Sequence, residues 1–157
     1  MARARGVNLT LRKTMDDTHA WCDCDRLDQV LANLLSNAIK FSSPGGSVSV
    51  AVTSAYMERR ERQDIASVQI DVSDDGVGIP QDELASIFDK FVQSSNTKSG
   101  SGGTGLGLSI CKEIVEDHGG RIWAECGAAG GSVFRVQIPR EREGDTAGAA
   151  IGWSEAS

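Results

Sequence analysis

Two stretches near the middle of the chain, Val48–Val52 and Val68–Val72, place an apolar side chain at every second position. This alternation predicts two strands, each with one buried face. The charged stretch Glu58–Asp64 lies between them, and we expect it to form a solvated hairpin connection. Helical patterns occur on both sides of this pair, so the sequence predicts a mixed α and β fold.

The helical patterns have recognisable ends. Asp25 is the expected N-cap of the first helix, with Asp28 at N3, and apolar residues at helical spacing continue until Ser42–Gly46. The second helix is expected from Leu106 to His118, closed by the glycine pair that follows. Short strands are further expected at Val7–Leu11, Trp21–Cys22, Arg121–Cys126 and Ser132–Ile138.

The segment from Asp75 to Gly105 is rich in glycine and serine and contains only a short apolar cluster between Leu84 and Phe91. A loop of this length in a compact domain is usually a functional lid or a disordered linker. We expect a lid at about residues 89–104.

The chain has 157 residues with 39% apolar composition, enough for one core, and a net charge of −6. Acidic balance without a basic stripe argues against nucleic acid as a partner. No apolar run reaches the roughly 18 residues of a membrane span, so we expect no membrane contact by this segment. We expect it in the cytoplasm, although a longer parent protein can still be membrane-anchored.

Four cysteines, at positions 22, 24, 111 and 126, could in principle bind zinc, but their spacing is not that of a known zinc site. Reduced, buried thiols are the favoured interpretation, and they indicate a reducing compartment.

Asn33, Asn37 and Lys40 fall within about 60° of arc on the first helix, so they can face one ligand. The Asn37 amide oxygen suits a hard cation such as Mg²⁺, and Lys40 suits a phosphate. The alternative interpretation is a solvated flank of an amphipathic helix.

Asp74 shares its strand face with Val68, Ile70 and Val72, which aims a carboxylate inward. A buried carboxylate needs a donor, and the exocyclic amine of adenine is one. Gly76 and Gly78 would let the backbone approach a flat base. An ordinary Asp-Gly turn is the alternative.

Glycines at 100, 102, 103, 105 and 107 precede the second helix, where backbone N–H groups and the helix dipole attract anions. A phosphate cradle is one interpretation and a set of lid hinges is another. The spacing is neither that of a P-loop nor that of a dinucleotide-binding unit.

In combination, these segments resemble the catalytic, ATP-binding domain of bacterial sensor histidine kinases, within the wider superfamily of gyrase, heat-shock chaperone and mismatch-repair ATPases. Gln29–Phe41 resembles the N box and Asp74–Pro80 the first glycine box. Ile87–Phe91 resembles the F box and Gly103–Leu108 the second glycine box. The resemblance runs from about Val7 to Pro139.

The resemblance implies an α+β fold, a two-layer sandwich (the Bergerat ATP-binding fold) with a mixed, mostly antiparallel sheet backed by three helices. ATP would lie on the helical face under a lid. Asn37 would bind Mg²⁺, Asp74 would accept from the adenine amine, Phe41 would pack near the base, and Lys40 would assist the phosphates. Ser132 occupies a place where relatives put a Ser or Thr near adenine. Further nucleotide contacts are expected from Asn33, Gly76, Gly78, Ile79, Lys90, Phe91, Lys98, Gly103, Thr104, Gly105, Leu106, Gly107 and Leu108.

Asn33 stands where hydrolysing relatives place a glutamate, and an amide is a poor general base. The resemblance therefore implies slow hydrolysis and transfer of the γ-phosphoryl group to a protein histidine. A serine kinase of the anti-sigma type and a non-catalytic nucleotide-binding module, both with this fold, remain the alternatives.

The two histidines, His19 and His118, lack the family's acceptor pattern, and His118 is interpreted as a helix cap. The acceptor is therefore expected on a dimerisation domain absent from this chain, with a response regulator as an indirect partner. We expect residues 1–6 to be the stub of an upstream helix, 7–140 the catalytic domain, and 141–157 a disordered tail. The isolated domain is expected to be inactive in autophosphorylation.

Overall fold

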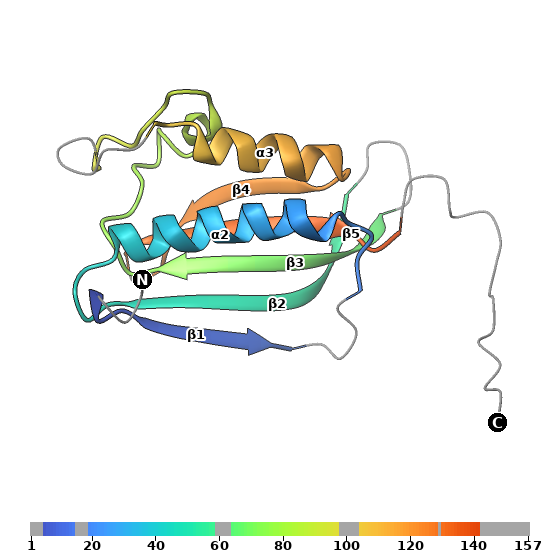
Figure 1. Cartoon of the computed structure of the whole chain (residues 1–157), viewed down its shortest axis with the longest axis horizontal. Coiled ribbons are helices and arrows are strands. Elements are labelled where there is room, and N and C mark those ends of the chain that lie inside the picture. Colours follow the sequence, from blue (N-terminus) through green and yellow to red (C-terminus); the bar gives the residue numbers. More distant parts are fainter. Residues whose placement is uncertain (1–4, 15–18, 59–63, 98–103, 129, 142–157) are drawn as a thin grey trace.

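A computed structural model describes residues 5–14, 19–58, 64–97, 104–128 and 130–141 (Figure 1). Five strands form one sheet in the order β1-β2-β3-β5-β4. β1 pairs with β2 in parallel, and the other three pairings are antiparallel. The strands are β1 (Asn8–Lys13), β2 (Ser47–Met57), β3 (Ile65–Asp74), β4 (Arg121–Cys126) and β5 (Ser132–Pro139).

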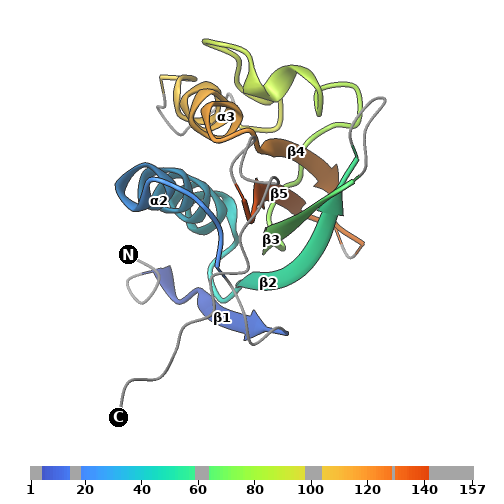
Figure 2. The ribbon, with the colours of Figure 1, turned by 90° about the vertical axis from the view of Figure 1, so that its right-hand side faces the viewer.

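Two α-helices, α2 (Cys24–Phe41) and α3 (Gly107–Asp117), lie side by side on one face of the sheet (Figures 1 and 2). The expected two-layer sandwich with a mixed, mostly antiparallel sheet is confirmed. Besides these two α-helices, the described residues include a 3-10 turn, η1 (Ser86–Phe88), and a helical residue at Arg5. The η1 turn is short because the surrounding segment makes turns and tertiary contacts and has no repeating apolar stripe.

The core lies between the helices and the sheet. Alternate residues of β3 and β5 point toward the helices, and the apolar stripe of α2 meets them there. Phe88 of η1 contacts Phe134 of β5 edge to face, with ring centroids 6.2 Å apart. The residues with no more than 2% exposure include Val30, Leu34, Ala38, Val48, Val72, Cys111, Val115, Val136 and Ile138.

The start of α2 corrects the predicted N-cap. The helix begins at Cys24, and Asp23, not Asp25, caps it by accepting a hydrogen bond from Arg26 N at 3.2 Å. Asp23 N also donates to His118 Nε2 at 2.9 Å, while His118 Nδ1 lies 2.7 Å from Ile114 O. His118 therefore caps the end of α3, as predicted, and also joins it to the start of α2. This tertiary bond favours Asp23 over Asp25 as the N-cap.

The predicted strand at Trp21–Cys22 is wrong, because these residues lead into α2 without pairing to the sheet. The prediction of buried thiols holds only for Cys111. All four cysteines are free, with Cys24 and Cys126 exposed and Cys22 half-buried. The two exposed thiols lie at element ends, where the apolar pattern of the sequence is no guide to burial.

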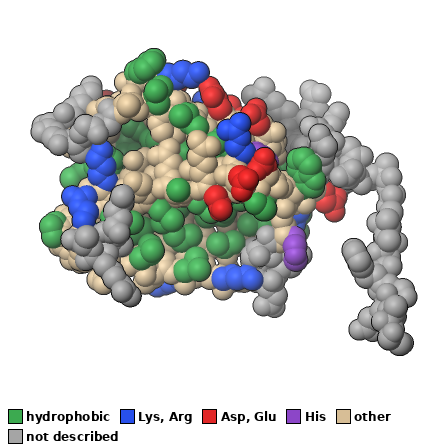
Figure 3. Space-filling view, in the orientation of Figure 1, with side chains coloured by type: hydrophobic (Ala, Val, Ile, Leu, Met, Phe, Trp, Pro, Cys, Tyr) green, Lys and Arg blue, Asp and Glu red, His purple; other side chains and the backbone are tan. Residues whose placement is uncertain are grey.

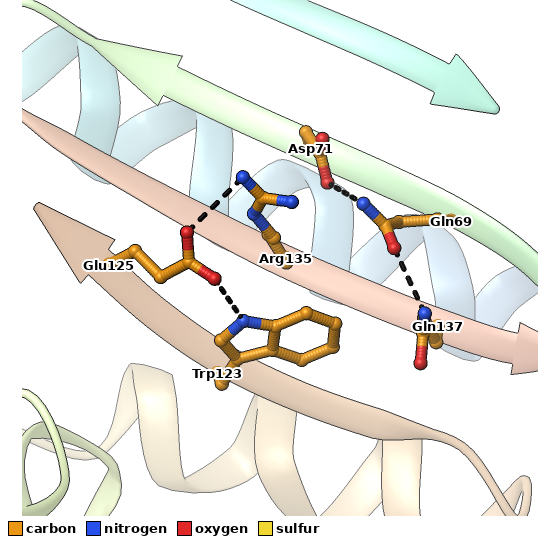
Figure 4. A network of polar contacts seen from close by, with 6 residues as sticks. All are labelled: Gln69, Asp71, Trp123, Glu125, Arg135 and Gln137. Carbon is orange, nitrogen blue, oxygen red and sulfur yellow. Dashed lines mark hydrogen bonds and ion pairs between the residues drawn. The ribbon is translucent and has the colours of Figure 1, made fainter. Parts of the chain in front are cut away.

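The face of the sheet turned away from the helices carries a polar network (Figure 4). Glu125 accepts from Trp123 Nε1 at 2.7 Å and pairs with Arg135 at 3.2 Å. Beside this group, Gln137 donates to Gln69 Oε1 and Gln69 donates to Asp71 Oδ1, each at 2.9 Å. Along β3, β5 and β4, the face toward the helices is therefore mainly apolar, and the opposite face carries this polar network.

On the helical side, apolar side chains also reach the surface over α2 and β1 (Figure 3). Leu9 and Leu11 of the edge strand β1 are 52% and 72% exposed. No helix in the described part of the chain has the length and apolar character needed to cross a membrane.

Some expectations lie outside the described residues. These are most of the stub at 1–6, most of the Glu58–Asp64 connection, the glycine-rich stretch 98–103 with Lys98 and Gly103, and nearly all of the tail.

Candidate functional site

A cavity of about 240 Å³ lies between α2, the start of α3, the ends of β3 and β5, and the segment 92–97. It is lined by Asn33, Asn37, Ala38, Lys40, Phe41, Asp74, Val77, Gly78, Ile79, Ile87, Val92, Gln93, Ser94, Thr97, Thr104, Gly105, Gly107, Leu108, Ser132 and Phe134.

The wall formed by α2 contains the predicted edge of the helix. Val30, Leu34 and Ala38 point into the core, and this orientation turns Asn33, Asn37 and Lys40 toward the cavity. Lys40 Nζ lies 5.1 Å from the centre of the Phe41 ring. The arrangement places amide groups and one ammonium group on the same wall.

Asp74 forms the inner end of the cavity. Only 8% of its surface is exposed, as the alternation along β3 predicts. Its Oδ1 accepts from Gly76 N at 2.9 Å, and its Oδ2 accepts from Ser132 Oγ at 2.6 Å. Each carboxylate oxygen has more than one lone-pair site, so both can still accept from a ligand.

Glycine is required where the two chain segments beside Asp74 meet. Gly131 has φ +73°, and a Cβ there would lie 2.0 Å from Asp74 O. Gly78 has φ +70°, and its Cβ would lie 3.0 Å from Gly131 O. The close backbone approach holds Ser132 against the carboxylate.

Asn33 is held from two sides. Its Nδ2 donates to Cys111 Sγ at 3.4 Å, and a Cβ at Gly107 would lie 2.6 Å from Nδ2 and 2.7 Å from Oδ1. Burial raises the pKa of the Cys111 thiol to about 11, so this group stays neutral. The amide of Asn33 therefore packs where a side chain on the first residue of α3 would otherwise lie.

The first turn of α3 forms the opposite end of the cavity. Thr104, Gly105, Gly107 and Leu108 line it, and the first helical N–H groups have no acceptor within the helix. These N–H groups and the helix dipole favour an anion. The cavity thus has a carboxylate at one end and anion-attracting groups at the other.

The segment 92–97 closes one side of the cavity and is anchored in place. Asn96 Nδ2 donates to Val77 O and Gly78 O, both at 3.2 Å. Ser95 N donates to Glu83 Oε2 at 2.9 Å. This part of the expected lid is therefore tied to the rim by three hydrogen bonds.

Twelve of the predicted site residues line the cavity, and four described ones do not. Lys90 points away and pairs with Glu113 at 2.8 Å, which raises the pKa of the lysine. Phe91 is 75% exposed, with φ 67°. Gly76 and Leu106 lie beside the cavity without lining it.

Eight lining residues were absent from the sequence prediction. Phe134 could have been found, because it shares the face of Ser132 on β5. The residues of segment 92–97 follow no apolar period, and only tertiary hydrogen bonds bring them to the cavity. The eight are Ala38, Val77, Ile87, Val92, Gln93, Ser94, Thr97 and Phe134.

Within the described residues, no group of three or more His, Cys, Asp or Glu side chains could hold a metal ion by itself. Asn37 offers a single neutral oxygen donor in the cavity. That donor fits a magnesium ion held mainly by waters and phosphate oxygens, which is how Mg²⁺ usually binds with nucleotides.

Comparison with known proteins gives a consistent result. Residues 22–142 match the family model "Histidine kinase-, DNA gyrase B-, and HSP90-like ATPase". The adaptive-response sensory kinase SasA of Synechococcus elongatus is 43% identical over 119 residues, which cover 76% of this chain and 28% of that protein. The chain spans about a third or less of the length of the first curated relatives it matches.

Among solved structures, the catalytic domain of the histidine kinase ThkA is similar, with a TM-score of 0.72 and 32% identity. The match covers 88% of this chain and 82% of that one. A second ThkA structure, in complex with the response regulator TrrA, matches with a TM-score of 0.69 and 30% identity, covering 90% of this chain and 36% of that one.

Proposed function

The chain belongs to the family of histidine kinase-, DNA gyrase B- and HSP90-like ATPases, and from this membership we propose that it is the ATP-binding catalytic domain of a sensor histidine kinase. It would bind Mg-ATP and transfer the γ-phosphoryl group to a histidine on a dimerisation domain. The observation that carries the proposal is the cavity itself, with a hydrogen-bonded carboxylate at one end and the glycine-rich start of α3 at the other.

Asp74 would recognise adenine. Its carboxylate accepts hydrogen bonds, and the exocyclic amine of adenine donates them. Ser132 and Gly76 N fix the orientation of the carboxylate before the base arrives, so little reorganisation is needed on binding.

The triphosphate would lie toward α3, near Lys40 and the first-turn N–H groups. Lys40 offers a point charge, and the helix end offers backbone donors. Asn37 would hold Mg²⁺, which when bound neutralises charge on the phosphates.

Asn33 supports group transfer over hydrolysis. Its amide cannot take a proton from water, and its contacts with Cys111 and Gly107 leave little room for another orientation. In the transfer, a nitrogen of the acceptor imidazole would form a bond to the γ-phosphorus. The bond from that phosphorus to the bridging oxygen would break, leaving ADP.

The acceptor domain and the response regulator would be the partners of this domain, by analogy with ThkA, whose complex with TrrA is a solved structure. Both would act in the cytoplasm, whether or not the parent protein is anchored in a membrane. The isolated chain would not label itself.

The test is Mg-dependent labelling of a supplied dimerisation domain with ATP carrying a radioactive γ-phosphate. We expect an acid-labile, base-stable phosphohistidine on the acceptor and none on this chain alone. Acid-stable phosphoserine would point to a serine kinase of the same fold. Nucleotide binding without labelling of any cognate acceptor would indicate a non-catalytic nucleotide-binding module.

A further inference from the structure

Ser94 carries a buried hydroxyl group without a partner. The residue is 4% exposed and lines the cavity. Within the described part of the chain, its Oγ has no hydrogen-bond partner. A buried hydroxyl that forms no hydrogen bond is unfavourable, so a hydrogen bond from Ser94 Oγ to a ligand in the cavity would be a gain.

The backbone around Ser94 is fixed. Ser94 O accepts from Thr97 N at 3.0 Å and from Thr97 Oγ1 at 2.9 Å. Ser95 and Asn96 are bonded to Glu83 and to the 77–78 carbonyls. The backbone at Ser94 is therefore held at the rim of the cavity by its own hydrogen bonds and by those of the two following residues.

Ser94 lies between the two ends of the cavity. On one side, Phe91 N donates to Gly105 O at 2.9 Å, which ties residue 91 to the chain ahead of α3. On the other side, Asn96 binds the carbonyls of Val77 and Gly78, which lie three and four residues beyond Asp74. The segment therefore runs along the cavity from its anion-attracting end toward its carboxylate end, with Ser94 near the middle.

A nucleotide bound with its base at Asp74 and its phosphates at α3 would have its ribose in the middle. We propose that Ser94 Oγ forms a hydrogen bond with a ribose hydroxyl of the bound nucleotide. This inference rests on the proposed function, and it assigns to Ser94 a role in selecting the sugar.

The test compares ATP, 2′-deoxy-ATP and 3′-deoxy-ATP by titration calorimetry with the wild-type chain, Ser94→Ala and Ser95→Ala. Ser95 is the matched control, because it loses the same hydroxyl one residue away on the exposed side of the segment. We expect Ser94→Ala to bind ATP about fivefold more weakly, the range of one hydrogen bond. We expect Ser95→Ala to bind ATP like the wild type.

The analogues locate the hydrogen bond. One of the two deoxy nucleotides should bind the wild type about fivefold more weakly than ATP does, and Ser94→Ala should bind that analogue no worse than the wild type does. If Ser94→Ala lost the same factor of affinity for ATP and for both analogues, the hydrogen bond of Ser94 would not involve the ribose, and the proposal would be overturned. Unchanged ATP binding in Ser94→Ala would mean that water alone satisfies the hydroxyl, which also overturns it.

Two measurements guard the interpretation. The melting temperature of nucleotide-free Ser94→Ala should not fall, since the hydroxyl has no partner to lose. The second measurement uses only the wild type, so it does not depend on whether a variant folds. Equal affinity of the wild type for ATP, 2′-deoxy-ATP and 3′-deoxy-ATP would overturn the role of Ser94 and leave the proposed function intact. Failure of the wild type to bind ATP at all would instead contradict the proposed function.

Discussion

Ser132 Oγ donates a 2.6 Å hydrogen bond to Asp74 Oδ2, and the two residues stand opposite each other in the antiparallel pairing of β5 with β3. The pairing fixes the orientation of a carboxylate that is almost fully buried. Because β5 lies about sixty residues after β3 in the sequence, the candidate site depends on the pairing of these two strands as well as on the glycine boxes.

Asp74→Asn should weaken ATP binding by about tenfold to a hundredfold, because an amide nitrogen repels the adenine amine where a carboxylate accepts from it. Titration calorimetry with Mg-ATP gives the affinity. The matched control is Asp71→Asn, on the same strand but on the opposite face of the sheet, which should leave affinity unchanged. Equal affinities for Asp74→Asn and the wild type would remove Asp74 from the site.

Gly107→Ala should lower nucleotide affinity, although alanine normally stabilises a helix by about 1 kcal/mol over glycine. The new Cβ would lie within 2.7 Å of the Asn33 amide and must displace it. Chemical denaturation should therefore show no gain in stability. The double variant Asn33→Ala/Gly107→Ala removes the clash, and its stability should exceed that of Gly107→Ala alone.

Asn37→Ala should remove most of the magnesium dependence of ATP binding. For the wild type, adding EDTA should weaken ATP binding by about tenfold, since the cation neutralises phosphate charge. The variant should bind ATP weakly with or without EDTA. A variant that keeps the full response to EDTA would place the metal elsewhere.

The Cys111 thiol should make stability depend on pH in the alkaline range. Its pKa is about 11 in the folded protein, above the ordinary value of 9.0, so the unfolded chain loses the proton first. The contribution of the thiol is fully present below pH 9.0 and is lost as pH rises toward about 11. Urea denaturation across this range should show a steeper fall in unfolding free energy for the wild type than for Cys111→Ala. Parallel curves would argue against this burial effect.

His118→Leu should lower the free energy of unfolding by about 1 kcal/mol, because it removes the bonds to Asp23 N and Ile114 O. Glu116→Gln, an exposed change in the last turn of the same helix, should have no effect. ATP affinity should be unchanged in both variants, because His118 lies outside the cavity lining.

The parts of the site on regular elements could be predicted from sequence. Strand parity predicted that Asp74 points inward, and helical spacing predicted that Asn33, Asn37 and Lys40 share a wall. In both cases the residue inherits its direction from an apolar pattern that the core enforces.

The parts on irregular segments could not be predicted in this way. Ser94 reaches the cavity because Asn96 binds two carbonyls that lie about twenty residues earlier in the chain. Lys90 does not line the cavity, because its ammonium group forms an ion pair with Glu113 on α3. Local spacing predicts neither contact, because each joins residues about twenty positions apart in the sequence.

The alternation along β3 has a genetic consequence. One face of β3 carries the core residues Val68, Ile70 and Val72 and ends with Asp74 in the cavity. Gln69 and Asp71, between them in the sequence, belong to the polar network on the other face. Insertion of a single codon between Val68 and Asp74 would exchange the two sets, moving apolar side chains to the outside or turning the carboxylate away from its serine. Such a shift by one residue would therefore disrupt the candidate site and the apolar core at the same time.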